Sequence, residues 1–286
     1  MSKVMVVTDS TSTIPRELLD RIPVRVLPLQ VIWGNEIFRD GVDISPNEFY
    51  TRLKTAKVMP TTSQTTPEEF NQVYAQLIGE GYDILSIHIA SKLSGTLDSA
   101  IQAKRNFPKA KIELVDSLST SMAMGFQVIA AARVAEAGGS LQDCKQIAEK
   151  ARDNSGVYFA LDTLEFLQRG GRIGGAAAFL GTVLKLKPLL EIRDGQVEAV
   201  ERVRTFSKTL DRLLDLVEIK LEKNPGFVRL CAIHGNSFEE GNLLLNKAIK
   251  RFSSSIVKET LITDISPVLG THAGPGALGM AFMIGV

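Results

Sequence analysis

The stretch DILSIHIASKLSGT, residues 83–96, contains the clearest fold signal in the chain. Its first eight residues are almost continuously apolar, which is typical of a parallel strand that is buried on both faces. The polar loop SKLSGT ends this strand, a helical pattern follows from about Leu97, and KIELVDS at residues 111–117 has the pattern of the next strand. Strand, helix and strand in this order predict a parallel α/β sheet in the first half of the chain.

Two more hydroxyl-rich loops accompany the predicted sheet. Residues 3–7 form another apolar strand pattern that ends in TDSTST (8–13), and TTSQTT (61–66) leads into a helix with Thr66 as its N-cap and Pro67 at its first position. Loops that follow the carboxyl ends of parallel strands converge on one crevice, the usual ligand site of such a sheet. Taken alone, each loop is better explained by hydroxyl groups that cap helices. Their recurrence in three places favours a binding site.

The second half of the chain has a different pattern. Helical patterns near 119–137 and 140–152 are followed by a hairpin that turns at Asp194-Gly195, by amphipathic helices and by the apolar final segment GMAFMIGV. This mixture predicts a partly antiparallel sheet. At 286 residues the chain also exceeds the usual size of one domain. We therefore predict an α/β fold with two domains, residues 1–153 with a parallel sheet in an α/β/α arrangement and residues 154–286 with a mixed sheet.

The composition argues against several classes of function. The 33 Lys and Arg residues nearly balance the 32 Asp and Glu residues, so there is no electrostatic reason to expect a nucleic acid partner. The two cysteines, Cys144 and Cys231, form no CxxC motif, which favours a reducing compartment. The N-terminus lacks the apolar region of a signal peptide, and no stretch approaches the roughly 18 apolar residues of a membrane span. We expect a soluble, cytoplasmic protein.

The segment LGTHAGPGALGMAF, residues 269–282, holds the histidine that is the best candidate for a binding site. Its glycine and proline residues are typical of a loop that would expose the ring of His272, although the ring would also serve to brace its own turn. His88 lies inside a strand pattern, and His234 lies at a strand end. The three histidines lack the spacing of metal ligands and no acidic cluster accompanies them, so we predict no metal site.

Two glycine-containing motifs are candidates for anion binding. In SKLSGT, Ser94 and Thr96 flank Gly95, which would let a ligand approach the backbone, and the N-terminal amides of the following helix favour an anion. LQRGGRIGG at residues 167–175 lacks the spacing of a nucleotide-phosphate loop. It leaves arginines such as Arg172 for an anionic ligand, for a partner or for solvent.

A hydrolase is the alternative hypothesis. Ser94 as nucleophile and His272 as base, oriented by Asp9 or Asp116, would make a lipid esterase or thioesterase. The sequence KLSGT does not match the GxSxG motif of the nucleophile elbow, so we place this hypothesis second.

Six motifs follow one another along the chain: VTDSTS (7–12), PTTSQTTPEEF (60–70), SKLSGT (91–96), VDS (115–117), LDTLEFLQRGGRI (161–173) and HAGPGALG (272–279). By their order and spacing they together resemble the DegV family of bacterial fatty-acid-binding proteins over essentially the whole chain. The resemblance implies two α/β domains that enclose a long-chain fatty acid between them. It also implies that the carboxylate is hydrogen-bonded by Thr62, Ser94 and His272, with further contacts from Gly95 and Thr96.

Other parts of the site are implied less directly. Additional candidates for its head-group end are Thr61, Ser63, Arg172 and Gly274. The family commonly continues TSQ with Pro and Ser, whereas this chain has two threonines before Pro67, so the contact from this loop is left open between Thr61 and Thr62. The stretches 173–184 and 279–283, rich in small or apolar residues, are candidates for the wall of the tail tunnel, or they are ordinary core.

The resemblance implies the fatty-acid-binding subunit of a bacterial fatty acid kinase, without an ATP site of its own. Such a subunit presents the bound carboxylate to a separate ATP-binding kinase subunit, which phosphorylates it to an acyl phosphate for phospholipid synthesis. No cofactor is implied, and we expect transient contact with a membrane surface. Burial of roughly 14 methylenes at about 0.8 kcal/mol each gives on the order of 11 kcal/mol before association costs, so the tail would supply most of the affinity.

Overall fold

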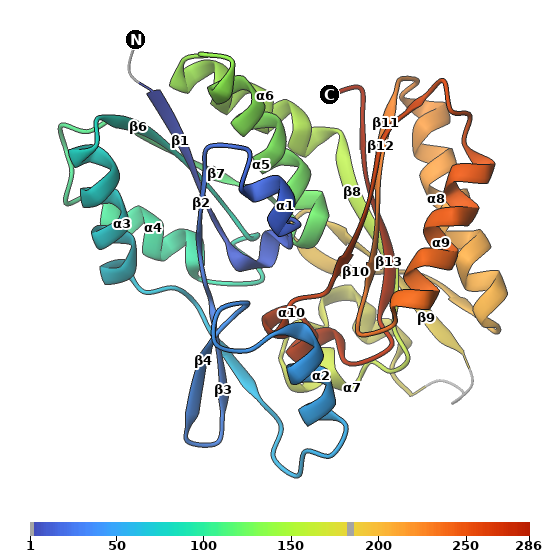
Figure 1. Cartoon of the computed structure of the whole chain (residues 1–286). Helices are drawn as coiled ribbons and strands as arrows, with labels where there is room; N and C mark the ends of the chain where they lie inside the picture. The colour runs from blue at the N-terminus through green and yellow to red at the C-terminus, as the bar shows by residue number, and fades with distance from the viewer. Residues whose placement is uncertain (1–2, 182–185) are drawn as a thin grey trace.

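The computed structural model describes residues 3–181 and 186–286, and its first sheet is parallel (Figure 1). The four strands lie in the order β2-β1-β6-β7. They are β1 (Lys3–Asp9), β2 (Val24–Leu27), β6 (Tyr82–His88) and β7 (Ile112–Asp116). All three strand pairs are parallel, as predicted. The last five residues of β6 are buried, in agreement with the central position expected from its apolar sequence.

Helices cover both faces of this sheet. On one face α3 (Pro67–Gly79) and α4 (Thr96–Lys104) pack against Val7 and Ile84. On the other face α5 (Ser121–Glu136) and α6 (Leu141–Asp153) pack against Val6 and Leu85. Because successive side chains of a strand point to opposite faces, neighbouring residues of β1 and of β6 join different cores.

The second sheet is mixed and has six strands, in the order β10-β9-β8-β13-β11-β12. The strands are β8 (Ser155–Ala160), β9 (Lys187–Arg193), β10 (Gln196–Val203), β11 (Val228–His234), β12 (Val257–Asp264) and β13 (Leu278–Ile284). β11 pairs in parallel with β12, and the other pairs are antiparallel. β9 and β10 form the predicted hairpin, with φ of 51° at Asp194 and 78° at Gly195 in its turn.

The helix α5 lies between the two sheets. α8 (Phe206–Lys223) and α9 (Phe238–Arg251) cover the outer face of the six-stranded sheet, whereas α5 lies against its inner face beside β8 and β13 (Figure 1). All residues from 121 to 132 are buried, which explains the almost uniformly apolar sequence of this helix. The predicted domain boundary falls between α6 and β8, but both halves of the chain contribute to the core around α5. The division into two domains stays a prediction.

A third, small sheet brings the two halves of the chain together again. Its antiparallel strands, in the order β4-β3-β5, are β3 (Gln30–Trp33), β4 (Glu36–Arg39) and β5 (Thr61–Ser63). Together with α2 (Pro46–Leu53) they pack against α10 (Pro267–Ala273) and α7 (Glu165–Arg169) from the second half. We call these six elements the small lobe; they lie at the bottom of Figure 1.

Two segments that the sequence predicts as loops are regular structure. The segment Thr61–Ser63 pairs with β3 as strand β5, because the edge of β3 offers free backbone hydrogen-bonding groups. Thr66 then caps α3 as predicted, and its hydroxyl accepts a hydrogen bond from the backbone N–H of Glu69. His272 lies in the last turn of α10, not in an exposed loop, and the chain leaves the helix only at Gly274, where φ is 75°.

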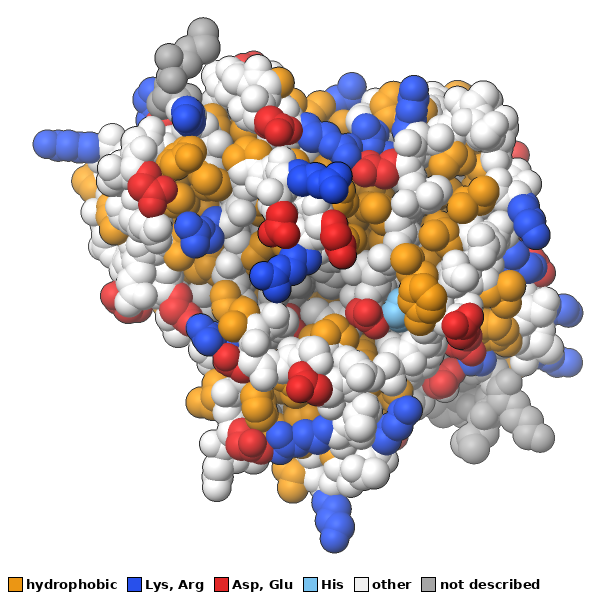
Figure 2. Space-filling view, viewed as in Figure 1, with side chains coloured by type: hydrophobic (Ala, Val, Ile, Leu, Met, Phe, Trp, Pro, Cys, Tyr) orange, Lys and Arg blue, Asp and Glu red, His pale blue; other side chains and the backbone are white. Residues whose placement is uncertain are grey.

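Three short helical segments complete the described chain: η1 (Ser10–Ser12), α1 (Arg16–Leu19) and η2 (Gly174–Phe179). Figure 2 shows acidic and basic side chains interspersed over one face, as expected from their nearly equal numbers. Within residues 3–181 and 186–286 no helix combines the length and the apolar character that a membrane crossing requires.

Candidate functional site

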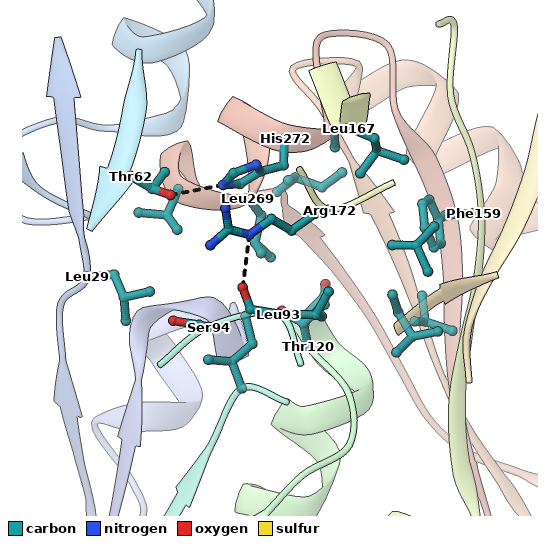
Figure 3. Close-up of a pocket in the computed structure, with 18 of the residues that line it drawn as sticks. Leu29, Thr62, Leu93, Ser94, Thr120, Phe159, Leu167, Arg172, Leu269 and His272 are labelled. Carbon is teal, nitrogen blue, oxygen red and sulfur yellow. Dashed lines mark hydrogen bonds between the residues drawn. The ribbon is translucent and has the colours of Figure 1, made fainter. Parts of the chain in front are cut away.

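A cavity of about 330 Å³ lies where the two large sheets and the small lobe meet (Figure 3). Most of its wall is apolar, with Leu29, Ile89 and Leu93 from the first half and Phe159, Ile192 and Val197 from the six-stranded sheet. One end is polar and is lined by Thr62, Ser63, Gln64, Ser94, Arg172 and His272. Thr120 and Ser121, at the start of α5, are the other polar residues of the wall. A cavity with this division suits a ligand with a polar head and a hydrocarbon tail.

At the polar end, Thr62 and His272 are bonded to each other. The hydroxyl oxygen of Thr62 on β5 lies 2.9 Å from Nε2 of His272 on α10 (Figure 3). Pairing with Val31 of β3 fixes the backbone of Thr62, and packing of α10 on α2 and α7 fixes the helix that carries His272. The small lobe therefore places both side chains before any ligand arrives.

The imidazole of His272 is neutral at physiological pH. Burial, together with the positive charge of Arg172, lowers its pKa to about 4. Nδ1 is buried and has no hydrogen-bond partner among the described residues. The α-carbon of Gly170 packs against that edge of the ring, since a Cβ atom at Gly170 would lie 2.1 Å from Nδ1. The ring therefore acts through Nε2, which faces Thr62.

Ser94 lies at the N-terminus of α4. Its hydroxyl is 2.9 Å from the hydroxyl of Thr96 and accepts a hydrogen bond from the backbone N–H of Thr96. Gly95 is the N-cap of α4 and supplies no side-chain cap, so the hydroxyl of Ser94 takes that place for the first amide of the helix, that of Thr96. The partial positive charge of the helix N-terminus still favours an anion nearby, as the sequence motif suggests.

Gln64 is a site residue that the sequence reasoning missed. Its side-chain amide donates to the backbone oxygen of Gly95 at 3.1 Å and to the hydroxyl of Ser99 at 2.8 Å. A Cβ atom at Gly95 would lie 2.2 Å from Oε1 of Gln64. The space beside the α-carbon of Gly95, which the sequence assigns to a ligand, is therefore filled by this amide. The only signal in the sequence is a single amide side chain within a run of hydroxyl residues.

Arg172 connects the two halves of the chain at the same end. Its Nε donates to the backbone oxygen of Leu93 at 3.1 Å (Figure 3), and Nη1 donates to the backbone oxygen of Gly170 at 2.7 Å. The side chain is otherwise exposed. It places a positive charge at the edge of the cavity, next to the neutral His272.

The structure places only some of the remaining predicted residues at the cavity. Ser63 lines the cavity, whereas Thr61 is exposed, pairs with Ile32 and does not line it. Thr96 is fully buried behind Ser94. Gly274 ends α10 and packs against the ring of Phe166, away from the wall of the cavity. Thr62, rather than Thr61, is thus the threonine of this strand at the cavity.

The described parts of the two stretches suggested for the tail wall do not line the cavity. None of the residues 173–181 or 279–283 lines the cavity, and residues 182–184 lie outside the described part of the chain. Met280 and Phe282 belong to the core under α8 and α9, and Ala281 belongs to the core around α5. Single side chains from the six-stranded sheet, from loops and from the helices α7 and α10 form the wall instead.

The residues of the alternative hydrolase are not assembled. Asp9 is fully buried and is bonded to Nδ1 of His88, to the backbone N–H of Ile89 and to Thr11. Asp116 is bonded to Ser91 and to the backbone of Leu118. With Nδ1 of His272 unpartnered in the described chain, no carboxylate orients this ring as a general base.

Comparison with known proteins identifies similar chains over the whole length. A family model described as an uncharacterised protein of the DegV family matches residues 3–284. A DegV domain-containing protein of Listeria innocua is 36% identical over 283 residues, which cover 99% of each chain.

Solved structures of DegV proteins have the same overall fold as this chain. A DegV family protein from Thermus thermophilus, described by its fatty acid binding, superposes with a TM-score of 0.92 at 37% identity and covers 99% of both chains. DegV of Bacillus subtilis, described as a fatty acid binding protein, gives a TM-score of 0.88 at 32% identity, with 99% of this chain and 100% of that chain covered. A stearic acid-binding protein from Eubacterium ventriosum gives 0.88 at 26% identity, with 99% and 98% covered.

Proposed function

The chain belongs to the DegV family, and on this basis we propose that it binds a long-chain fatty acid in the cavity between its sheets. The observation that carries the proposal is the division of the cavity into one polar end and an otherwise largely apolar wall. The fatty acid ligands named for the similar structures from Thermus thermophilus and Eubacterium ventriosum support it.

We assign the carboxylate to the polar end. Nε2–H of His272 and the hydroxyl of Thr62 donate to the two carboxylate oxygens in place of the bond between them, and the hydroxyl of Ser94 is the third donor. These donors are uncharged, yet hydrogen bonds to an ionised acceptor are the stronger kind. They offset the desolvation of the carboxylate, which would otherwise cost several kcal/mol. Arg172 adds a positive charge at the exposed edge.

The apolar wall takes the tail. Leu29, Leu93 and Phe159 lie on different sides of the cavity in Figure 3, so a hydrocarbon chain between them is shielded from water on every side. At about 0.8 kcal/mol for each methylene, this burial supplies most of the affinity, and the head group supplies orientation.

We further propose that the protein is a carrier that acts with a separate kinase in the cytoplasm. A carboxylate oxygen of the bound acid attacks the γ-phosphorus of ATP held by that kinase, the bond to ADP breaks, and an acyl phosphate forms for phospholipid synthesis. The exposed Arg172 and the partly exposed Ser94 loop support this arrangement, because the head group then lies near the surface. Exchange of the acid requires transient contact with a membrane surface.

Native mass spectrometry of the purified protein tests the first step: a retained mass of a long-chain acid is expected. Incubation of the loaded protein with ATP and an ATP-binding fatty acid kinase subunit tests the second, with acyl phosphate trapped by hydroxylamine as the product. A protein that retains no lipid and binds none when it is offered would refute the binding proposal. Binding without acyl phosphate would leave a lipid sensor in place of a carrier.

A further inference from the structure

The amide of Gln64 joins two parts of the polar end that come from different sheets. Gln64 follows directly after β5, which carries Thr62, and its amide reaches the N-terminus of α4, which carries Ser94 next to Gly95. The chain distance between donor and acceptor is 31 residues for Gly95 and 35 residues for Ser99. Both N–H groups of the amide are used, so the side chain is held in one orientation.

The hydrogen-bonding capacity of its partner decides which way this amide is oriented. The backbone oxygen of Gly95 can only accept a hydrogen bond, so the nitrogen of Gln64 and not its oxygen must face it. Residues on both sides of Gln64 are also fixed: Ser63 belongs to β5, and the buried Thr65 donates its hydroxyl hydrogen to the backbone oxygen of Pro28. The side chain of Gln64, with its hydrogen bonds to Gly95 and Ser99, therefore holds the two segments at a defined distance, and we call this contact the brace.

Gly95 shows that the brace needs close contact. Its φ of −75° is accessible to any residue, so the backbone conformation does not require glycine here. The requirement is space, since a Cβ atom would lie 2.2 Å from Oε1 and 2.8 Å from Cδ of Gln64. A methyl group at this position would push the amide away and separate the two loops.

We propose that Gln64 is a positioning residue that sets the distance between Thr62 and Ser94, and so decides how well the polar end distinguishes a carboxylate from an uncharged head group. The inference rests on the proposed binding of a fatty acid. Gln64 lines the polar end, but both of its amide N–H groups are used by Gly95 and Ser99, so it acts through these residues and not by donating to the ligand. A carboxylate needs donors at two fixed positions, whereas an alcohol needs one partner, so a change in spacing weakens binding of the acid more than binding of the alcohol.

The test compares the affinities of palmitic acid and of hexadecanol for the delipidated full-length protein and its variants. Gln64→Met keeps the size of the side chain and removes both donors. We expect the ratio of acid to alcohol affinity to fall about tenfold, with the affinity for hexadecanol nearly unchanged. Gly95→Ala should lower the same ratio, and the double variant should be no worse than the stronger single variant, because both changes break one brace.

Gln127→Met is the matched control. Gln127 is a buried glutamine on α5 whose amide donates to the backbone oxygens of Ser117 and Ala123, and it does not line the cavity. This variant should lose stability but keep the ratio of the parent. An unchanged ratio in Gln64→Met, in a parent that prefers the acid, overturns the inference. A parent that binds neither compound overturns the proposed function instead.

Discussion

Thr62 and His272 are 210 residues apart in the chain and share one hydrogen bond of 2.9 Å across the small lobe. The bond joins a strand of the first half to a helix of the second half. Both groups have hydrogen-bonding capacity for a carboxylate, and neither carries a charge when His272 is neutral. The polar end is thus organised in advance, which lowers the cost of ordering side chains when the ligand binds.

Replacement of His272 by alanine removes one donor to the carboxylate. We expect affinity for palmitic acid to fall about 10- to 100-fold, because a hydrogen bond to a charged group contributes about 1.5 to 3 kcal/mol. Isothermal titration calorimetry with the delipidated protein measures this loss. His234→Ala is the control, since His234 is buried but does not line the cavity. Equal affinities of His272→Ala and the parent would remove His272 from the site.

The stability of the protein should decrease in mild acid because of His272. Its pKa in the folded protein is about 4, below the ordinary 6.5 of an unfolded chain. Between these values the unfolded state binds a proton that the folded state does not bind, so the free energy of unfolding falls as the pH drops from 6.5 towards 4. Urea unfolding at pH 7 and pH 5 should show a smaller loss for His272→Gln than for the parent, by about 1 to 2 kcal/mol. Identical losses in the two proteins would contradict this assignment.

The sequence is sufficient to predict the elements whose signals are local. The continuous apolar run of β6 indicates a central parallel strand, and Asp194-Gly195 indicates the turn between β9 and β10. Ser94 and His272, which the sequence also singles out, both line the cavity, and their role in binding stays a prediction.

The parts that the sequence misses depend on contacts between distant segments. The strand β5 forms only because β3 offers an edge, and the ring of His272 is partly buried only because α10 packs on α2 and α7. The hydrogen bond from Gln64 to Gly95 and the apolar wall of the cavity also depend on contacts between distant segments. Val197 in β10 and Leu29 between β2 and β3 meet at one cavity although no local pattern relates them.

Addition of a methyl group at Gly170 should displace His272 without changing it. A Cβ atom at this position would lie 2.1 Å from Nδ1 and 2.8 Å from Cε1 of the ring, so Gly170→Ala forces the imidazole away from Thr62. We expect affinity for palmitic acid to fall about tenfold, in parallel with His272→Ala. Gly79→Ala, at a helix position of α3 with no atom near the added methyl group, is the control and should bind normally. Full affinity in Gly170→Ala would mean that the position of the ring is not important.

Asp40 should affect stability in the direction opposite to His272. Its side chain is 2% exposed, and its Oδ1 accepts a hydrogen bond from the backbone N–H of Val268 near the start of α10. Burial raises its pKa to about 6, although the nearby hydroxyls of Ser10 and Ser266 and the backbone N–H of Val268 act to lower it. As the pH falls from 6 towards 4, the folded state binds a proton before the unfolded state does, so this carboxyl group adds stability in acid and costs stability at pH 7.

Asp40→Asn separates the cost of burying the charge of Asp40 from the contribution of its hydrogen bond to Val268. The variant keeps the shape and the acceptor for Val268 but carries no charge. We expect its free energy of unfolding at pH 7 to exceed that of the parent by about 1 kcal/mol or more, and the difference to shrink at pH 5, where Asp40 of the parent is mostly protonated. Chemical unfolding at the two pH values measures both differences. A variant that is less stable than the parent at pH 7 would show instead that the charge of Asp40 stabilises the start of α10, and with it the position of His272.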